Sequence, residues 1–143
     1  MVKRATPQEL APAAPAQSLT DRAYADLEEM IVTLKLARLF EKSAKVNDDV
    51  TFMRTDREFN TLCVNATRNE FAAGAMSLMH SLSRRFWYIH YKQAADMPLT
   101  AKLHADIARA IAGEDEEGAA KATDRLLDVI EKFTLDTVST DVG

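Results

Sequence analysis

The segment Phe52–Cys63, which reads FMRTDREFNTLC, governs the interpretation of the rest of the chain. In an α-helix, residues three and four positions apart share a face. One such face of this segment is apolar except for the carboxylate of Asp56 and the amide of Asn60. Removing an unpaired charge from water costs on the order of several kcal/mol. Asp56 therefore pairs with a polar neighbour in the interior, lies at an exposed edge, or binds a ligand or metal inside a helical bundle.

Composition is that of a single globular domain. The chain has 143 residues, of which 47% are hydrophobic, enough for one sizeable core. Its net charge of −4 offers no general basic surface for nucleic acid. The single cysteine, Cys63, excludes an internal disulfide and is expected to be a small core residue. No apolar run approaches the ~20 residues that cross a bilayer, and no secretory signal opens the chain, so we expect a cytoplasmic protein.

Apolar periodicity predicts an all-α protein without strands. We expect helices over residues 20–46, 49–67, 70–93, 99–112 and 116–137. Short polar segments separate them, including Asn47–Asp49 before the second helix and Asp115 as the N-cap of the last. Gly113 lies where a left-handed residue commonly ends a helix. Helices joined by such short loops predict an antiparallel bundle with a central polar pocket.

The domain is expected to occupy residues 18–138. Residues 1–17 combine alanine, glutamine and three prolines, which block a continuous helix, and are predicted to form a flexible arm. The final residues, 139–143, are predicted to be a frayed tail.

Polar side chains interrupt the apolar faces of three predicted helices. Asp56 and Asn60 share one helix, Arg85 follows in the next beside Arg84, and His104 lies in the fourth. The face assigned to the third helix is Phe71, Ala75, Leu78, Leu82, Arg85 and Ile89. A lone histidine on an apolar face is more often a hydrogen-bonded core residue, and the two arginines also fit a surface band. Together, however, these five residues predict a ligand pocket in an apolar shell.

The same residues allow a partial metal site. Asp56 and His104 are suitable ligands for Zn²⁺, Ni²⁺ or Mn²⁺, and Asn60 is a weaker oxygen ligand. An arginine suits the carboxylate of a small organic acid. Catalysis is not expected, because the sequence offers no activated nucleophile and no glycine-rich phosphate loop.

Three runs together resemble the FCD effector-binding domain of GntR-family transcription regulators. They are DREFN, followed by Asn69, then LHADIARAIAGED and AAKATDRLLDVI, and the resemblance covers about residues 19–135. The positions that match the family's spaced motifs are Asp56, Phe59, Asn60, His104, Ile107, Ala110, Ile111, Asp115 and the pair Leu126–Leu127. The resemblance implies an all-α bundle that senses a metabolite.

In that family, three histidines and an aspartate hold a divalent metal, which binds a small acid together with an arginine. Carried over to this chain, Asp56 and His104 are retained, Asn60 replaces one histidine and Leu126 replaces another. Leucine donates nothing and an amide is a poorer ligand than imidazole, so the metal is expected to be weakly held or absent. The carboxylate effector would otherwise bind the polar side chains directly.

The resemblance also implies partners. GntR regulators carry a winged helix-turn-helix before this domain, whereas this chain has at most residues 1–17 there, so we expect no direct DNA binding by it alone. The family's first helix is shortened or replaced, which leaves apolar surface near Ala23 and predicts a homodimer. The alternative is a helical interaction module with a degenerate pocket, which pairs with itself or with a full-length regulator.

Overall fold

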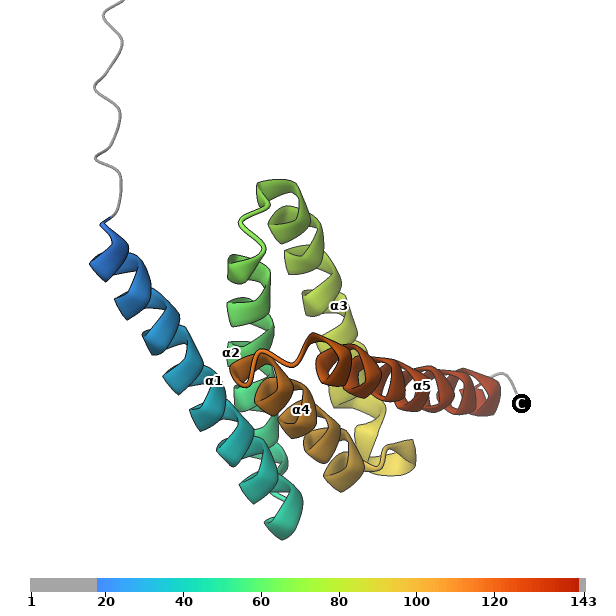
Figure 1. The fold of residues 1–143 in the computed structure, drawn as a ribbon. Helices are drawn as coiled ribbons and strands as arrows, with labels where there is room; N and C mark the ends of the chain where they lie inside the picture. The colour runs from blue at the N-terminus through green and yellow to red at the C-terminus, as the bar shows by residue number, and fades with distance from the viewer. Residues whose placement is uncertain (1–17, 142–143) are drawn as a thin grey trace, which may run out of the picture.

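A computed structural model describes residues 18–141 as five α-helices, and no strand occurs in this part of the chain (Figure 1). The helices are α1 (Leu19–Val46), α2 (Asp49–Ala66), α3 (Glu70–Ala94), α4 (Met97–Ala112) and α5 (Glu116–Asp141). The predicted all-α fold is therefore confirmed. The arm predicted over residues 1–17 lies outside the described residues.

Short polar side chains fix where the helices begin. The Asp48 carboxylate accepts the backbone N–H of Thr51 at 3.0 Å, and this hydrogen bond lowers the pKa of Asp48. The same N-cap geometry recurs at the starts of the other helices, where the capping residues are Ser18, Asn69, Asp96 and Asp115. Each cap satisfies a backbone donor that has no partner within the helix, so the predicted boundaries are close to the observed ones.

Three boundary predictions are wrong in detail. Helix α4 begins at Met97 because Pro98 fits the first turn, where no backbone donor is needed. Gly113 has a φ of −93°, and the left-handed residue is Glu114, with a φ of 54°. Helix α5 continues to Asp141, so residues 139–141 belong to the helix and not to a frayed tail.

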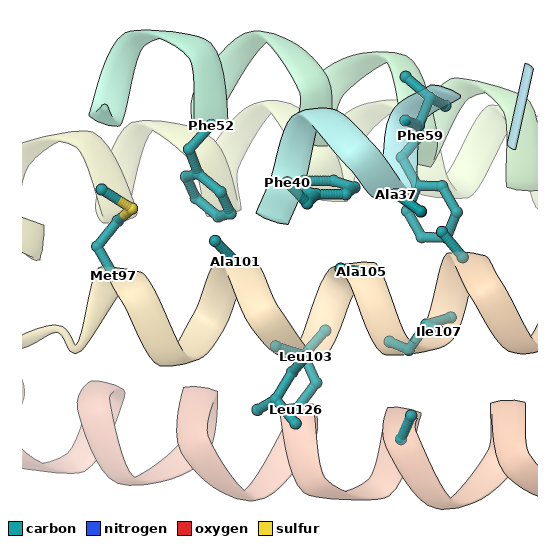
Figure 2. Close-up of a cluster of buried hydrophobic side chains, with 13 residues drawn as sticks. Ala37, Phe40, Phe52, Phe59, Met97, Ala101, Leu103, Ala105, Ile107 and Leu126 are labelled. Atoms are coloured by element: carbon teal, nitrogen blue, oxygen red, sulfur yellow. The ribbon is translucent and has the colours of Figure 1, made fainter. Parts of the chain in front are cut away.

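The core is built around α4, which packs most extensively against α1 and next against α5. Its alanines let α1 approach closely, and the ring of Phe40 lies over them between Phe52 and Phe59 of α2 (Figure 2). The Phe40 ring meets that of Phe59 edge-on, with the ring centroids 5.8 Å apart. On the other side of α4, Leu103 packs toward Leu126 of α5 (Figure 2).

Helix α3 presents a different face to the bundle from the one predicted. Phe71 is 93% exposed, and the other large apolar residues of the predicted stripe, Leu78, Leu82 and Ile89, are also exposed. The inward face instead carries Trp87, whose ring centroid lies 4.7 Å from that of Phe133 in α5. Apolar residues occur on several sides of α3, so periodicity alone does not select the buried side.

The C-terminal part of α3 is tied to the start of α2 by one hydrogen bond. The Tyr91 hydroxyl donates to the Asp49 carboxylate. This bond, with the negative charge of Asp49, raises the pKa of Tyr91 to about 12. The contact places the C-terminal end of α3 beside the N-terminal end of α2.

Candidate functional site

His104 lies in the aromatic part of the core. It is 7% exposed, and its ring centroid is 5.0 Å from that of Phe40 and 5.5 Å from that of Phe52. Phe59 completes this shell, with its ring centroid 6.4 Å away. The predicted placement of an imidazole on the apolar face of α4 is therefore observed. Because the imidazole is buried, each of its ring nitrogens needs a partner.

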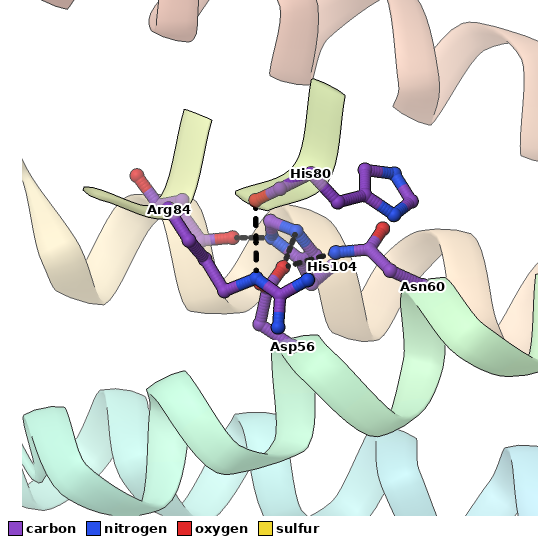
Figure 3. Close-up of polar contacts among 6 residues, drawn as sticks. Asp56, Asn60, His80, Arg84 and His104 are labelled. Carbon is purple, nitrogen blue, oxygen red and sulfur yellow. Dashed lines mark hydrogen bonds and ion pairs between the residues drawn. The ribbon is translucent and has the colours of Figure 1, made fainter. Parts of the chain in front are cut away.

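Both ring nitrogens of His104 have partners. Nδ1 lies 2.8 Å from the carbonyl oxygen of Thr100, one turn earlier in α4. Nε2 lies 3.1 Å from Oδ1 of Asp56, and that same oxygen accepts a hydrogen bond of 3.0 Å from Nδ2 of Asn60 (Figure 3). The acid, amide and imidazole predicted from sequence are thus brought together. We call Asp56, Asn60 and His104 the α2–α4 cluster.

The geometry requires a proton between Asp56 and His104. A backbone carbonyl only accepts, so Nδ1 of His104 carries a hydrogen that it donates to Thr100. If the ring is neutral, Nε2 carries no hydrogen and can only accept a hydrogen bond. It faces Oδ1 of Asp56, which in an ionised carboxylate also can only accept. A proton on either atom turns this opposition into a hydrogen bond. With that proton in place, both ring nitrogens of His104 and Oδ1 of Asp56 have hydrogen-bond partners within the protein.

The structure brings Arg84 toward the site and leaves Arg85 away from it. Arg84 is half-buried and its Nε donates to the backbone carbonyl of His80 at 3.3 Å. Arg84 and His80 reach from α3 toward Asp56 and Asn60 (Figure 3). Arg85 is exposed with the rest of the predicted stripe, so its expected inward placement is wrong.

A cavity of about 570 Å³ lies between α2 and α3. Its lining consists of Arg57, Thr61, Val64, Asn65, Ala73, Ser77, His80, Ser81 and Arg84. We call it the α2–α3 cleft. The sequence reasoning missed Arg57 and His80, although helical spacing gives the signal: Arg57 and Thr61, like His80 and Arg84, are four residues apart and share a face.

The donor set does not fit a divalent metal. Within residues 18–141, no three His, Cys, Asp or Glu side chains converge on one point. Asp56 and His104 are the two strong donors, and Asn60 turns its NH₂ group toward Asp56. Leu126 is 8% exposed and belongs to the hydrophobic core, where it donates nothing. Two strong donors fall short of the three or four that protein sites use.

Comparison with known proteins gives one result. The family model of the FCD domain matches residues 9–129 of the 143. No curated protein and no solved structure matches the chain. None of the described helices has the length and apolar character required to cross a membrane. Because the family model covers most of the sequence, the chain belongs to the FCD domain family, the non-catalytic effector-binding and dimerisation domains of GntR regulators.

Proposed function

We propose that this domain senses a small organic acid on behalf of a GntR-type regulator in the cytoplasm, and that it does so as a homodimer. The observation that carries the proposal is the meeting of Asp56 and Asn60 of α2 with His104 of α4, beside the aromatic shell of His104, with Arg84 of α3 reaching toward them (Figure 3). Arg84 would bind the acid group by charge-assisted hydrogen bonds. Asp56, Asn60 and His104 would form the adjoining wall. Arg85 is left out because it is exposed on another face of α3.

A second function is favoured by the hydrogen bonding of the α2–α4 cluster. The ring nitrogens of His104, the amide donor of Asn60 and one oxygen of Asp56 all have partners without any ligand. A pocket whose polar groups are already satisfied has little affinity to offer. The domain would then be a helical interaction module that pairs with itself or with a full-length regulator.

Thermal unfolding with a panel of small carboxylates separates these two functions. If the domain is a sensor, at least one acid raises the melting temperature, because a ligand that binds only the folded state stabilises it by about 2.7 kcal/mol at one hundred times its Kd. Added Zn²⁺ or Ni²⁺ is expected to leave that response unchanged, since the donor set is incomplete. A panel in which no acid shifts the melting temperature would leave the interaction module as the function.

The proposed homodimer forms through the exposed face of α3. Phe71, Ala75, Leu78, Leu82, Arg85 and Ile89 are all exposed and alternate at spacings of four and three residues, the spacing of a coiled-coil seam. Pairing two copies antiparallel, with the two-fold axis between Leu78 and Leu82, places these two leucines opposite each other. It also sets the small Ala75 opposite the long Arg85. A parallel pairing would instead oppose two arginines.

Replacing Leu78 and Leu82 together with glutamate is expected to convert the dimer into a monomer. The paired helices would then face four carboxylates where four leucines packed. Both leucines are more than half exposed, at 64% and 57%, so the fold of one protomer should survive. Light scattering after size-exclusion chromatography gives the mass. The matched control is Leu27→Glu with Ile31→Glu, on the α1 surface predicted from sequence; a dimer lost in the control and kept in the α3 variant would place the interface on α1.

A further inference from the structure

We propose that the α2–α3 cleft is a binding site for a small hydroxylated molecule with a phosphate or carboxylate head. The proposal rests on the proposed sensing function, because it names the chemistry of the effector and the residues that bind it. The anion would then bind in the α2–α3 cleft and not against the α2–α4 cluster, because no residue of that cluster lines the cleft.

The register of the two helices gives the cleft a direction. Helices α2 and α3 run antiparallel from the short loop between them (Figure 1), and Tyr91 of late α3 bonds to Asp49 of early α2. Arg57 therefore lies across from Ser81 and Arg84, whereas Val64 lies near Ala73 at the loop end. One end of the cleft is cationic and the other is weakly apolar.

The cationic end has no counter-charge of its own. No aspartate or glutamate lines the cleft. Within the described residues, the ion pairs belong to other side chains: His104 with Asp56, Arg109 with Glu41, Lys121 with Glu117 and Lys132 with Asp136. Arg84 uses Nε on a backbone carbonyl, which leaves the rest of its guanidinium free to bind. Two guanidinium groups that face one cavity without a carboxylate favour an oxyanion.

The α2–α4 cluster is the weaker candidate for that anion. Oδ1 of Asp56 is already engaged by His104 and by the Asn60 amide, and within the described residues no third metal donor stands beside the pair. The imidazole of His104 is already engaged at both nitrogens. Arg57 and Arg84 are therefore the groups with binding capacity to spare.

The middle of the cleft indicates what the head is attached to. Ser77 and Ser81 present hydroxyls along its length, with the His80 ring and the Asn65 amide beside them; the Thr61 hydroxyl donates to the Arg57 carbonyl at 2.8 Å and keeps its oxygen as an acceptor. Such groups donate to and accept from the hydroxyls of a ligand. A volume of about 570 Å³ lies in the ~300–1,000 Å³ range of small-molecule sites and exceeds what a bare phosphate fills. The occupant is thus a hydroxylated body with one charged end.

Calorimetric titration of the full chain tests this assignment. The probes are glycerol phosphate, glycerate, inorganic phosphate and glycerol. The three anions are expected to bind, and glycerol is not. Whichever of glycerol phosphate and glycerate binds more tightly shows whether the site prefers a phosphate or a carboxylate head. That compound should also bind more tightly than inorganic phosphate, which lacks the hydroxylated body. Arg57→Gln and Arg84→Gln are each expected to raise the Kd of the tighter compound at least tenfold. The matched controls, Arg54→Gln and Lys92→Gln, remove a charge from exposed positions of the same helices and should change it less than twofold.

The assignment is overturned if none of the probes binds, if glycerol binds as well as the anions, or if the four variants bind alike. Arg84 could instead balance the charge of Asp56, and Arg84→Gln would then lower the unfolding free energy while leaving the Kd unchanged, which also overturns it. A carboxylate from the wider panel could stabilise the wild-type chain and bind with a Kd that Arg57→Gln and Arg84→Gln do not change. That result would exclude the α2–α3 cleft as the binding site but would still support the sensing function. Sensing itself fails only if no compound stabilises the chain.

Discussion

Truncating Phe40 to alanine is expected to lower the free energy of unfolding by about 3–5 kcal/mol. Phe40 is fully buried where α1 crosses α2 and α4, and its ring contacts those of Phe52, Phe59 and His104. The truncation removes all three contacts and leaves a cavity at the centre of the aromatic shell. Domains of this size are stable by only about 5–15 kcal/mol, so one substitution would remove a large part of the total.

Urea denaturation followed by circular dichroism measures this loss, at one fixed protein concentration because the stability of a dimer depends on concentration. The control is Leu127→Ala in α5, a side chain that is 56% exposed and should change stability by less than about 0.5 kcal/mol. Equal losses in the two variants would show that the core does not centre on Phe40.

The sequence is sufficient where each helix has one apolar side and polar caps. The buried side of α5, which includes Ala122, Leu126 and Phe133, follows helical spacing, and the exposed charged residues Asp124, Arg125 and Asp128 mark another side. Helix α3 lacks this contrast: Leu78, Leu82 and Ile89 offer one apolar side, and Phe86 and Trp87 offer another. Tertiary packing selects the second, since only that side meets Phe133 of α5.

The same ambiguity explains which site residues were predicted. Asp56 and His104 lie on helices with a clear apolar face, and the structure joins them. Neighbouring residues on a helix point in directions about 100° apart, since a turn takes 3.6 residues. The wrong side of α3 therefore put Arg85 on the predicted inward face, whereas the structure turns Arg84 inward and leaves Arg85 exposed. Sequence periodicity also could not reveal the cleft, because a cavity depends on how far apart α2 and α3 lie.

Removing either partner of the Asp56–His104 pair is expected to lower the free energy of unfolding by about 3 kcal/mol. An unpaired buried polar group costs about 1–3 kcal/mol and a broken buried ion pair about 3–5 kcal/mol, so this value lies where the two ranges meet. Asp56→Ala leaves Nε2 of a buried imidazole without its partner, and His104→Ala leaves the carboxylate with Asn60 alone. The double variant, Asp56→Ala with His104→Ala, removes both polar groups together and should cost less than the two single losses added. This coupling distinguishes a closed interior pair from two independent side chains.

The measurement is a double-mutant cycle by urea denaturation, with Asp106→Ala, a half-buried acid of α4, as the control for loss of a carboxylate. Additive losses would mean that Asp56 and His104 do not interact. Single losses near zero would mean that water, and not the partner, satisfies each group. In either case the α2–α4 cluster would not be a preorganised wall for an effector pocket, because its side chains would not hold each other in place. A strong coupling, by contrast, would show that the pair ties α2 to α4 at Asp56, the residue directly before Arg57 of the cleft.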